Sequence, residues 1–334
     1  MDVVLALGGG GVKCFAQLGA LQAFERAGLR VRAVAATSAG GLVGAGFAAG
    51  HLRQQARGRL VARIVGDLGR LAQQNRRRAL VAVLAGGEAL LDARAAHHVI
   101  HTLVGLRTFA ELDVPLALTT VDLDSGARHV LHAGAVAPAL RAAIAIPGLF
   151  PPETLHGKRL IDGGAIDPVP VRAARRLAPG LPVVAVVLTP RPAGTARHPA
   201  AARLDGLPAA RLFRRLRFVR AFEVFVRAAD ISHRALLESR LTLDQPEIII
   251  RPNVAHLDLF GRVDALAVVA EGERAAAAVL RDELDAMREV LRGGACEDGR
   301  DDRWDDARHT AWARPSAAAR RKRATASATG TPAL

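Results

Sequence analysis

Ser38 occupies a position where a serine could act as a nucleophile. The run Ala36-Thr37-Ser38-Ala39-Gly40 lies between a strand-like segment and a stretch of small residues. It matches the pattern G-x-S-x-G, except that alanine replaces the first glycine. A sharp strand-to-helix turn holds the serine hydroxyl out at the strand end, and the helix N-terminus favours negative charge that develops there. A serine in such a turn is also a common helix cap, so both roles stay open.

A run of four glycines, Gly8–Gly11, follows the first strand-like segment. Consecutive backbone N–H groups in such a run can cradle an anion. A Walker A loop needs Ser or Thr after its lysine, whereas Cys14 follows Lys13 here, and the dinucleotide fingerprint lacks its last glycine. No acidic residue follows the second strand to hold a ribose. The remaining chemical role for this run is an oxyanion hole, which stabilises a tetrahedral intermediate.

Asp162 is the third candidate. It follows the short strand-like segment Arg159–Ile161 and precedes Gly163 and Gly164. Two glycines allow another backbone to pass close to a rigidly held carboxylate. Asp-Gly is also a common turn, so the motif alone is weak. Its importance comes from the serine, which needs a base, because no histidine stands in an obvious triad position.

Taken together, these blocks resemble the patatin-like phospholipase family, especially its bacterial members related to neuropathy target esterase. The blocks follow in the order G-G-G-G-V-K at 8–13, A-T-S-A-G-G at 36–41, R-A-A-I-A-I-P-G-L-F-P-P at 141–152 and D-G-G at 162–164. The resemblance continues to about residue 290 and leaves only the C-terminal tail outside it. Four blocks in this order are far more specific than any one of them.

The resemblance implies a role for each matching position. Ser38 is expected as the nucleophile and Asp162 as the proton acceptor of a Ser–Asp dyad. The expected oxyanion-hole residues are Gly9, Gly10 and Gly11, and the supporting positions are Lys13, Gly40, Gly163 and Gly164. The implied fold is a three-layer α/β/α arrangement around a central, mostly parallel sheet. The implied reaction is hydrolysis of fatty-acyl esters of lipids, as in a phospholipase or lysophospholipase, without a metal or another cofactor.

Three residues depart from the family pattern. Cys14 replaces the last glycine of the glycine motif, Ala36 replaces the first glycine of the serine turn, and Ala143 stands where related bacterial sequences usually have serine. The first two add bulk at tight turns, so reduced activity is the expected risk. The alternative function is therefore a catalytically weak patatin-like scaffold that binds a lipid or a protein partner.

The spacing of apolar residues predicts the elements that position these groups. Val3–Leu7 and Val31–Ala36 read as buried strands, and apolar residues recur every three positions from Phe15 to Phe24, which predicts a helix between them. Further strands are expected at 115–121, 128–132, 159–161, 182–188 and 247–251. Further helices are expected at 89–103, 137–146, 169–177 and 262–291, and residues 52–78 are expected to form a helical excursion with a solvated face. Residues 189–202 are expected as a surface loop, followed by a helical stretch to about residue 241. The chain is 50% apolar but only 4% aromatic. A core of Leu, Val, Ile and Ala suits helices on a parallel sheet.

The composition also predicts domain organisation and location. Residues 1–292 are expected to form the acyl hydrolase domain and 293–334 a disordered basic tail, because the tail lacks apolar periodicity. The N-terminus lacks the features of a signal peptide, and the longest strongly apolar run, 79–85, is too short to span a membrane. Two cysteines indicate a reducing compartment. We expect a cytoplasmic protein, with contact at the membrane periphery.

A net charge of +14 predicts an anionic partner. Segment 211–227 holds four of the ten Phe residues among six Arg residues. Amphipathic helices of this kind lie on anionic membranes, although a helix that packs its Phe side chains in the core while its Arg residues face water fits the segment slightly better. The other charge runs read as solvated, so no specific nucleic acid partner is expected, and the sequence does not indicate an oligomeric state. His97 and His101 have helical spacing but lack the H-E-x-x-H pattern, which favours a solvated face over a zinc site.

Overall fold

The computed structural model describes residues 1–51, 93–190, 217–257 and 263–293, which contain one eight-stranded sheet. Its strands are β1 (Asp2–Leu7), β2 (Arg30–Thr37), β3 (Leu116–Asp122), β4 (Arg128–Leu131), β5 (Glu153–Leu155), β6 (Lys158–Asp162), β7 (Val183–Val186) and β8 (Ile248–Ile250). The order is β5-β6-β3-β2-β1-β7-β8, and β4 pairs with β3. Strands β3, β2, β1, β7 and β8 run parallel, whereas β4, β5 and β6 pair antiparallel. The sheet is therefore mostly parallel, as predicted.

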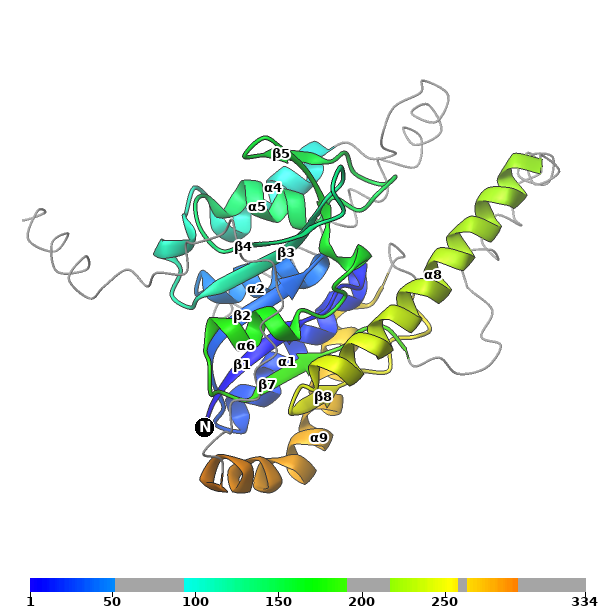
Figure 1. The fold of residues 1–334 in the computed structure, drawn as a ribbon. Coiled ribbons are helices and arrows are strands. Elements are labelled where there is room, and N and C mark those ends of the chain that lie inside the picture. Colours follow the sequence, from blue (N-terminus) through cyan, green and yellow to red (C-terminus); the bar gives the residue numbers. More distant parts are fainter. Residues whose placement is uncertain (52–92, 191–216, 258–262, 294–334) are drawn as a thin grey trace, which may run out of the picture. The chain divides into compact units, whose positions relative to one another are not determined.

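Helices cover both faces of this sheet (Figure 1). The helices are α1 (Phe15–Arg26), α2 (Ala39–Ala48), α4 (Ala93–Val104), α5 (Val136–Ala143), α6 (Val171–Leu177), α8 (Arg217–Asp244) and α9 (Ala265–Gly293), with short 3-10 turns η1 (Gly11–Cys14), η2 (Phe109–Glu111) and η3 (Gly163–Ala165). Side chains of a strand alternate between faces, so Leu5 and Leu7 of β1 join one core and Val4 and Ala6 the other. The first core contains α1, α2, α4, α5 and α9, and the second contains α6 and α8. This is the predicted three-layer α/β/α arrangement.

Helices α1 and α9 cross in very close contact. A β-carbon added to Gly272 would lie 1.8 Å from the Ala16 carbonyl oxygen, and one added to Gly19 would lie 1.9 Å from the Val269 carbonyl oxygen. Real side-chain atoms do not approach backbone oxygens so closely, so the crossing requires glycine on both helices. The crossing joins the first helix of the chain to the last described helix.

Most predicted elements are confirmed. Strand β2 includes the predicted Val31–Ala36 and extends one residue further at each end. The three-residue strand β5 was not predicted, because too few residues alternate to give a pattern. No helix among the described residues is both long and apolar enough to cross a membrane.

Several sequence-based expectations lie wholly or partly outside the described residues. These are the helical excursion at 52–78, most of the loop at 189–202, the start of the helix expected at 89–103, and the tail from 294 onward. The predicted tail boundary at 292/293 falls at the end of α9. The disordered character of the tail stays a prediction.

Candidate active site

Ser38 lies in the turn between β2 and α2, at the N-terminus of the helix. Its backbone has φ 56° and ψ −135°, a conformation that non-glycine residues rarely adopt. The side chain makes no hydrogen bond that would cap α2, although Ser38 stands at the cap position. Strain without a capping role is typical of a functional serine held at a sharp strand-to-helix turn. The sequence had left a helix cap open as an alternative, and the structure disfavours it.

Small residues allow this turn to pack against the end of β1. A β-carbon on Gly40 would lie 2.7 Å from the carbonyl oxygens of both Leu7 and Gly8. A β-carbon on Gly9 would lie 2.9 Å from the Ser38 β-carbon. The glycine run and the serine turn are therefore in direct contact, and neither position has room for a side chain.

The glycine run presents amides beside Ser38, but they are not equivalent. The Gly9 amide donates to the Pro168 carbonyl at 3.2 Å, whereas the amides of Gly10 and Gly11 donate no hydrogen bond to the described residues. Gln17, fully buried, donates from its Nε2 to the Gly8 carbonyl at 2.7 Å and supports the loop from below. The amides available to an incoming anion are thus those of Gly10 and Gly11.

Asp162 ends β6 and caps the short turn η3. Its Oδ1 accepts a hydrogen bond of 2.8 Å from the Gly164 amide, while its buried Oδ2 has no hydrogen-bond partner among the described residues. A β-carbon on Gly163 would lie 2.5 Å from the Thr119 carbonyl oxygen. The two glycines predicted that another backbone passes close by, and the backbone of β3 does so.

Sheet register brings Asp162 and Ser38 together. Thr37, which precedes Ser38, is opposite Thr119 of β3, and the next residue, Thr120, is opposite Asp162. The ends of β2 and β6 therefore lie at the same level on the two sides of β3. The Ser38 hydroxyl is near enough to act as a donor that favours the charged carboxylate. No hydrogen bond of ordinary geometry joins them, and such contacts often tighten only when substrate binds.

Burial controls the charge state of Asp162. Asp162 is only 5% exposed. Loss of solvation raises the pKa of Asp162 from 3.8 to about 6, and the Ser38 hydroxyl and Gly164 amide oppose this rise. A carboxyl group of this pKa is a stronger base than an exposed aspartate and still mostly ionised at neutral pH.

A second buried carboxylate, that of Asp167, lies near the end of β2. Asp167 accepts a 2.5 Å hydrogen bond from Arg128, and its backbone carbonyl accepts one of 2.9 Å from Thr37. Burial raises the pKa of Asp167, and the Arg128 guanidinium opposes that shift. Sequence reasoning did not identify this network, because it joins β2, β4 and the loop after η3 through long-range contacts.

The three residues that depart from the family pattern lie in the interior of the domain. Cys14, Ala36 and Ala143 are all buried in the core that contains α1 and α2. Burial raises the pKa of the Cys14 thiol to about 12, so the thiol stays neutral. Of the remaining supporting positions, Lys13 is buried in η1 beside Cys14.

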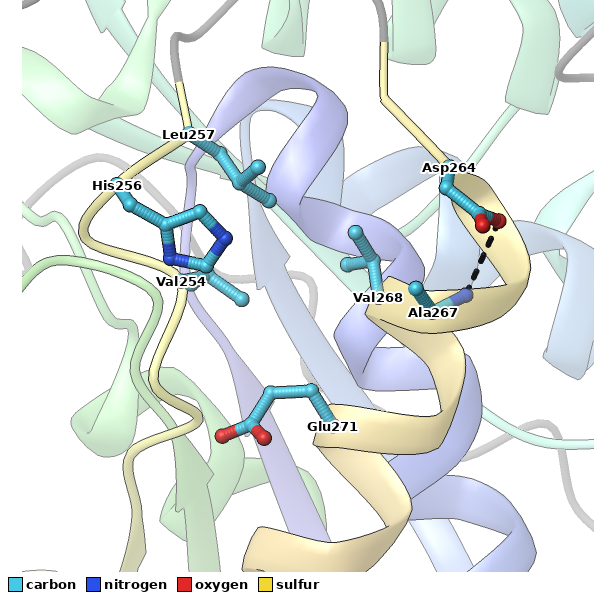
Figure 2. A pocket seen from close by; sticks show the side chains of 7 residues that line it. All are labelled: Val254, His256, Leu257, Asp264, Ala267, Val268 and Glu271. Atoms are coloured by element: carbon cyan, nitrogen blue, oxygen red, sulfur yellow. Dashed lines mark hydrogen bonds between the residues drawn. The ribbon is translucent and has the colours of Figure 1, made fainter.

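Two other groups are separate from this site. His97 and His101 are exposed on α4, in agreement with a solvated helix face. A pocket of about 170 Å³ lies at the start of α9 and contains none of the predicted site residues (Figure 2). Its carboxylates have structural partners: Asp264 accepts from the Leu266 and Ala267 amides, and Glu271 accepts from the Asn253 amide.

His233 of α8 is a neighbour of the site that sequence reasoning missed. Its ring lies against Gly164, and Cε1 is 3.8 Å from the place that a Gly164 β-carbon would take. The ring belongs to no local motif, and only the packing of α8 brings it here. The nearest available signal was the helical periodicity of this segment, which does not identify a contact partner.

The chain is similar in sequence to known proteins. A family model described as patatin-like phospholipase matches residues 5–175. An uncharacterized NTE family protein of Mycobacterium bovis is 32% identical over 198 residues, which are 58% of this chain and 51% of that protein. A lysophospholipase of Mycosarcoma maydis is 28% identical over 173 residues, 51% of this chain and 9% of that protein. The chain thus spans about half the length of the mycobacterial relative and much less of the fungal one.

A solved structure, VipD from Legionella pneumophila, aligns with a TM-score of 0.45 at 14% identity. The alignment covers 84% of this chain and 66% of that one.

Proposed function

Because the chain belongs to the patatin-like phospholipase family, we propose that it is a serine acyl hydrolase that cleaves fatty-acyl esters of lipids. One observation carries the proposal: Ser38, which has a strained backbone and does not cap α2, lies near the buried Asp162, whose pKa is raised to about 6. A nucleophile beside a base of suitable pKa is the minimum machinery for acyl transfer.

Acylation begins when Ser38 Oγ attacks the acyl carbonyl and its proton passes to Asp162. Oδ2 is the proposed acceptor, because Oδ1 is already engaged by the Gly164 amide. The carbonyl oxygen becomes an oxyanion, and the free amides of Gly10 and Gly11 are proposed to stabilise it. Gly9 contributes by its lack of a side chain, which lets the loop approach Ser38.

Departure of the alcohol completes acylation, and deacylation then follows with water as the nucleophile. The intermediate collapses, the ester C–O bond breaks, and the alcohol leaves with the proton from Asp162. A water molecule then attacks the acyl-enzyme and gives its proton to Asp162, which returns it to Ser38 Oγ as the fatty acid departs. Each atom and proton is accounted for with these two side chains and the loop amides.

The alternative of a catalytically weak scaffold has less support. It depended on added bulk from Cys14 and Ala36, and both side chains are accommodated in the core. Lipid esters are the proposed substrates, and the name of the fungal relative favours lysophospholipids among them. We propose cytoplasmic action on the basis of cysteine usage.

Contact with an anionic membrane is part of the proposal. Val224 and Ile231 lie seven residues apart on one face of α8, and each is 67% exposed. Arg227 is exposed between them, and the chain has a net charge of +14. Phe218, from the Phe- and Arg-rich segment, belongs to the same helix, although its side chain lies outside the described residues. Exposed apolar groups beside basic ones match the surface of an anionic bilayer.

Labelling with a fluorophosphonate probe tests the proposed nucleophile. Wild-type protein should be labelled once per chain, and Ser38→Ala should not be labelled. Ser38→Ala and Asp162→Asn should each reduce hydrolysis of a short p-nitrophenyl ester on the order of 10³-fold or more, since a dyad has no third member to compensate.

Matched controls come from exposed turns of the same domain. Ser125→Ala and Asp124→Asn, between β3 and β4, should label and hydrolyse like wild type. Near wild-type turnover in Asp162→Asn would require another base and would refute the dyad. A panel of phospholipids and lysophospholipids then identifies the preferred ester.

A further inference from the structure

His233 contacts the turn that carries Asp162, although it comes from a distant part of the chain. Its ring lies close enough to the backbone of Gly164 to interact with it, and Cε1 is 3.8 Å from the place that a Gly164 β-carbon would take. The ring is partly buried, and this burial lowers its pKa, which favours the neutral form at neutral pH. A neutral ring can donate one N–H to a carbonyl without placing a charge beside the site.

Gly164 is consequently contacted from two sides. Its amide donates to Asp162 Oδ1 at 2.8 Å, and its backbone also meets the His233 ring. Movement of Gly164 would release Oδ1 and let the Asp162 carboxylate rotate away from Ser38. His233 thus acts on the orientation of the proposed base through one intervening hydrogen bond, the one that the Gly164 amide donates to Asp162.

The face of α8 that contains His233 is docked along the whole segment after Asp162. Arg240, seven residues further, donates to the Ile166 carbonyl at 3.3 Å, and Asp244, four residues beyond, pairs with Arg172 at 2.6 Å. Leu237 and Leu241 are buried on the same face. Because residues at these spacings share one side of a helix, α8 acts as a rigid support for this segment. Among these contacts, that of His233 lies nearest to Asp162 in the chain.

We propose that His233 is a positioning residue, which fixes the Asp162 carboxylate against Ser38 by holding Gly164. This role rests on the proposed function of Ser38 and Asp162. His233 does not contact the reacting atoms in this mechanism, so its loss should affect turnover more than substrate binding. Misplacement of a catalytic group by a fraction of an ångström is enough to lower a rate substantially.

Kinetics of three variants test the role. His233→Ala should lower kcat for a p-nitrophenyl ester about tenfold and leave KM within about twofold. His233→Gln keeps an N–H donor and should restore kcat to within about threefold of wild type. Ser232→Ala, on the exposed neighbouring position of α8, is the matched control and should be unaffected.

Hydrogen exchange gives a readout that does not depend on turnover. Peptides covering residues 158–168 should exchange faster in His233→Ala than in Ser232→Ala, while peptides from β1 and β2 stay protected. Wild-type kcat in His233→Ala, unchanged exchange at 158–168, or a loss of protection throughout the sheet that His233→Gln does not reverse would each overturn the role. If the wild-type protein has no turnover, the proposed function and this role are both refuted. If the wild-type protein is active and His233→Ala is unaffected, only the role of His233 is refuted.

Discussion

The charge on Asp162 links burial to catalysis at the scale of a single residue. Since burial raises the pKa of this carboxyl to about 6, the proposed base loses its activity in mildly acidic solution. We expect kcat/KM for a soluble ester to rise with pH through about 6 and then level off. The rate of fluorophosphonate labelling should follow the same curve, because both report ionisation of the free enzyme. Activity that stays constant down to pH 4 would contradict the assignment.

The same pKa predicts an unusual effect on stability. The folded state binds the Asp162 proton more tightly than the unfolded state, so this group's contribution to stability is present below pH 4 and is lost as pH rises through 6. Asp162→Asn removes the buried charge. It should raise the free energy of unfolding at pH 8 on the order of 1–3 kcal/mol, and the gain should vanish near pH 4. Urea denaturation at both pH values measures this, and destabilisation at pH 8 would contradict it.

Sequence reasoning predicted those residues of the candidate site that stand in local motifs. Ser38, Asp162 and the glycine run were predicted because each combines a strand end with a turn of small residues. Arg128, Asp167 and His233 were missed, because their contacts depend on strand pairing and helix docking across the chain. The engagement of the Gly9 amide by Pro168 was equally invisible, since no spacing rule predicts which loop carbonyl meets an amide.

At the scale of elements, the glycine crossing of α1 and α9 gives a direct test. Gly272→Ala would place a β-carbon on the Ala16 carbonyl, so the helices must separate. Overpacking of this kind costs about 1–3 kcal/mol, and loss of core contact adds to it. We expect a clearly lowered melting temperature for Gly272→Ala by circular dichroism. Ala277→Ser, on the exposed side of the same helix, should melt like wild type, and equal melting of both variants would contradict the crossing.

Periodicity predicted elements better than it predicted their pairing. The long apolar runs of β1, β2 and β7 and the three-residue spacing of α1 gave the correct types, because buried parallel strands and amphipathic helices leave strong patterns. The strand order with β6 beside β3 carries no such pattern. This order depends on contacts between segments that are distant in the sequence, which form only in the assembled domain.

At the scale of the whole molecule, the charge and exposed face of α8 predict membrane behaviour. The protein should co-sediment with vesicles containing anionic lipid and not with neutral ones, and added salt should weaken the binding. Val224→Ser with Ile231→Ser should reduce this binding without a loss of soluble-ester turnover, because both side chains are exposed. Leu266→Ser, also exposed but on α9, is the matched control. Equal binding to neutral and anionic vesicles would contradict the prediction.

The family match ends at residue 175, yet the domain continues well beyond it. Strands β7 and β8 extend the parallel sheet past β1, and α9 covers α1. A fragment that ends with the match would expose the outer edge of β1 and the face of α1.

The α1–α9 crossing also dictates an order of events during translation. The apolar surface of α1 leaves the ribosome well before its partner helix, which follows only after roughly 250 further residues, about 10–50 s later at bacterial or eukaryotic elongation rates. During that interval the nascent chain presents an uncovered hydrophobic helix to the cell. Chaperone contact should therefore concentrate on residues 15–24 of ribosome-bound chains and disappear once α9 emerges.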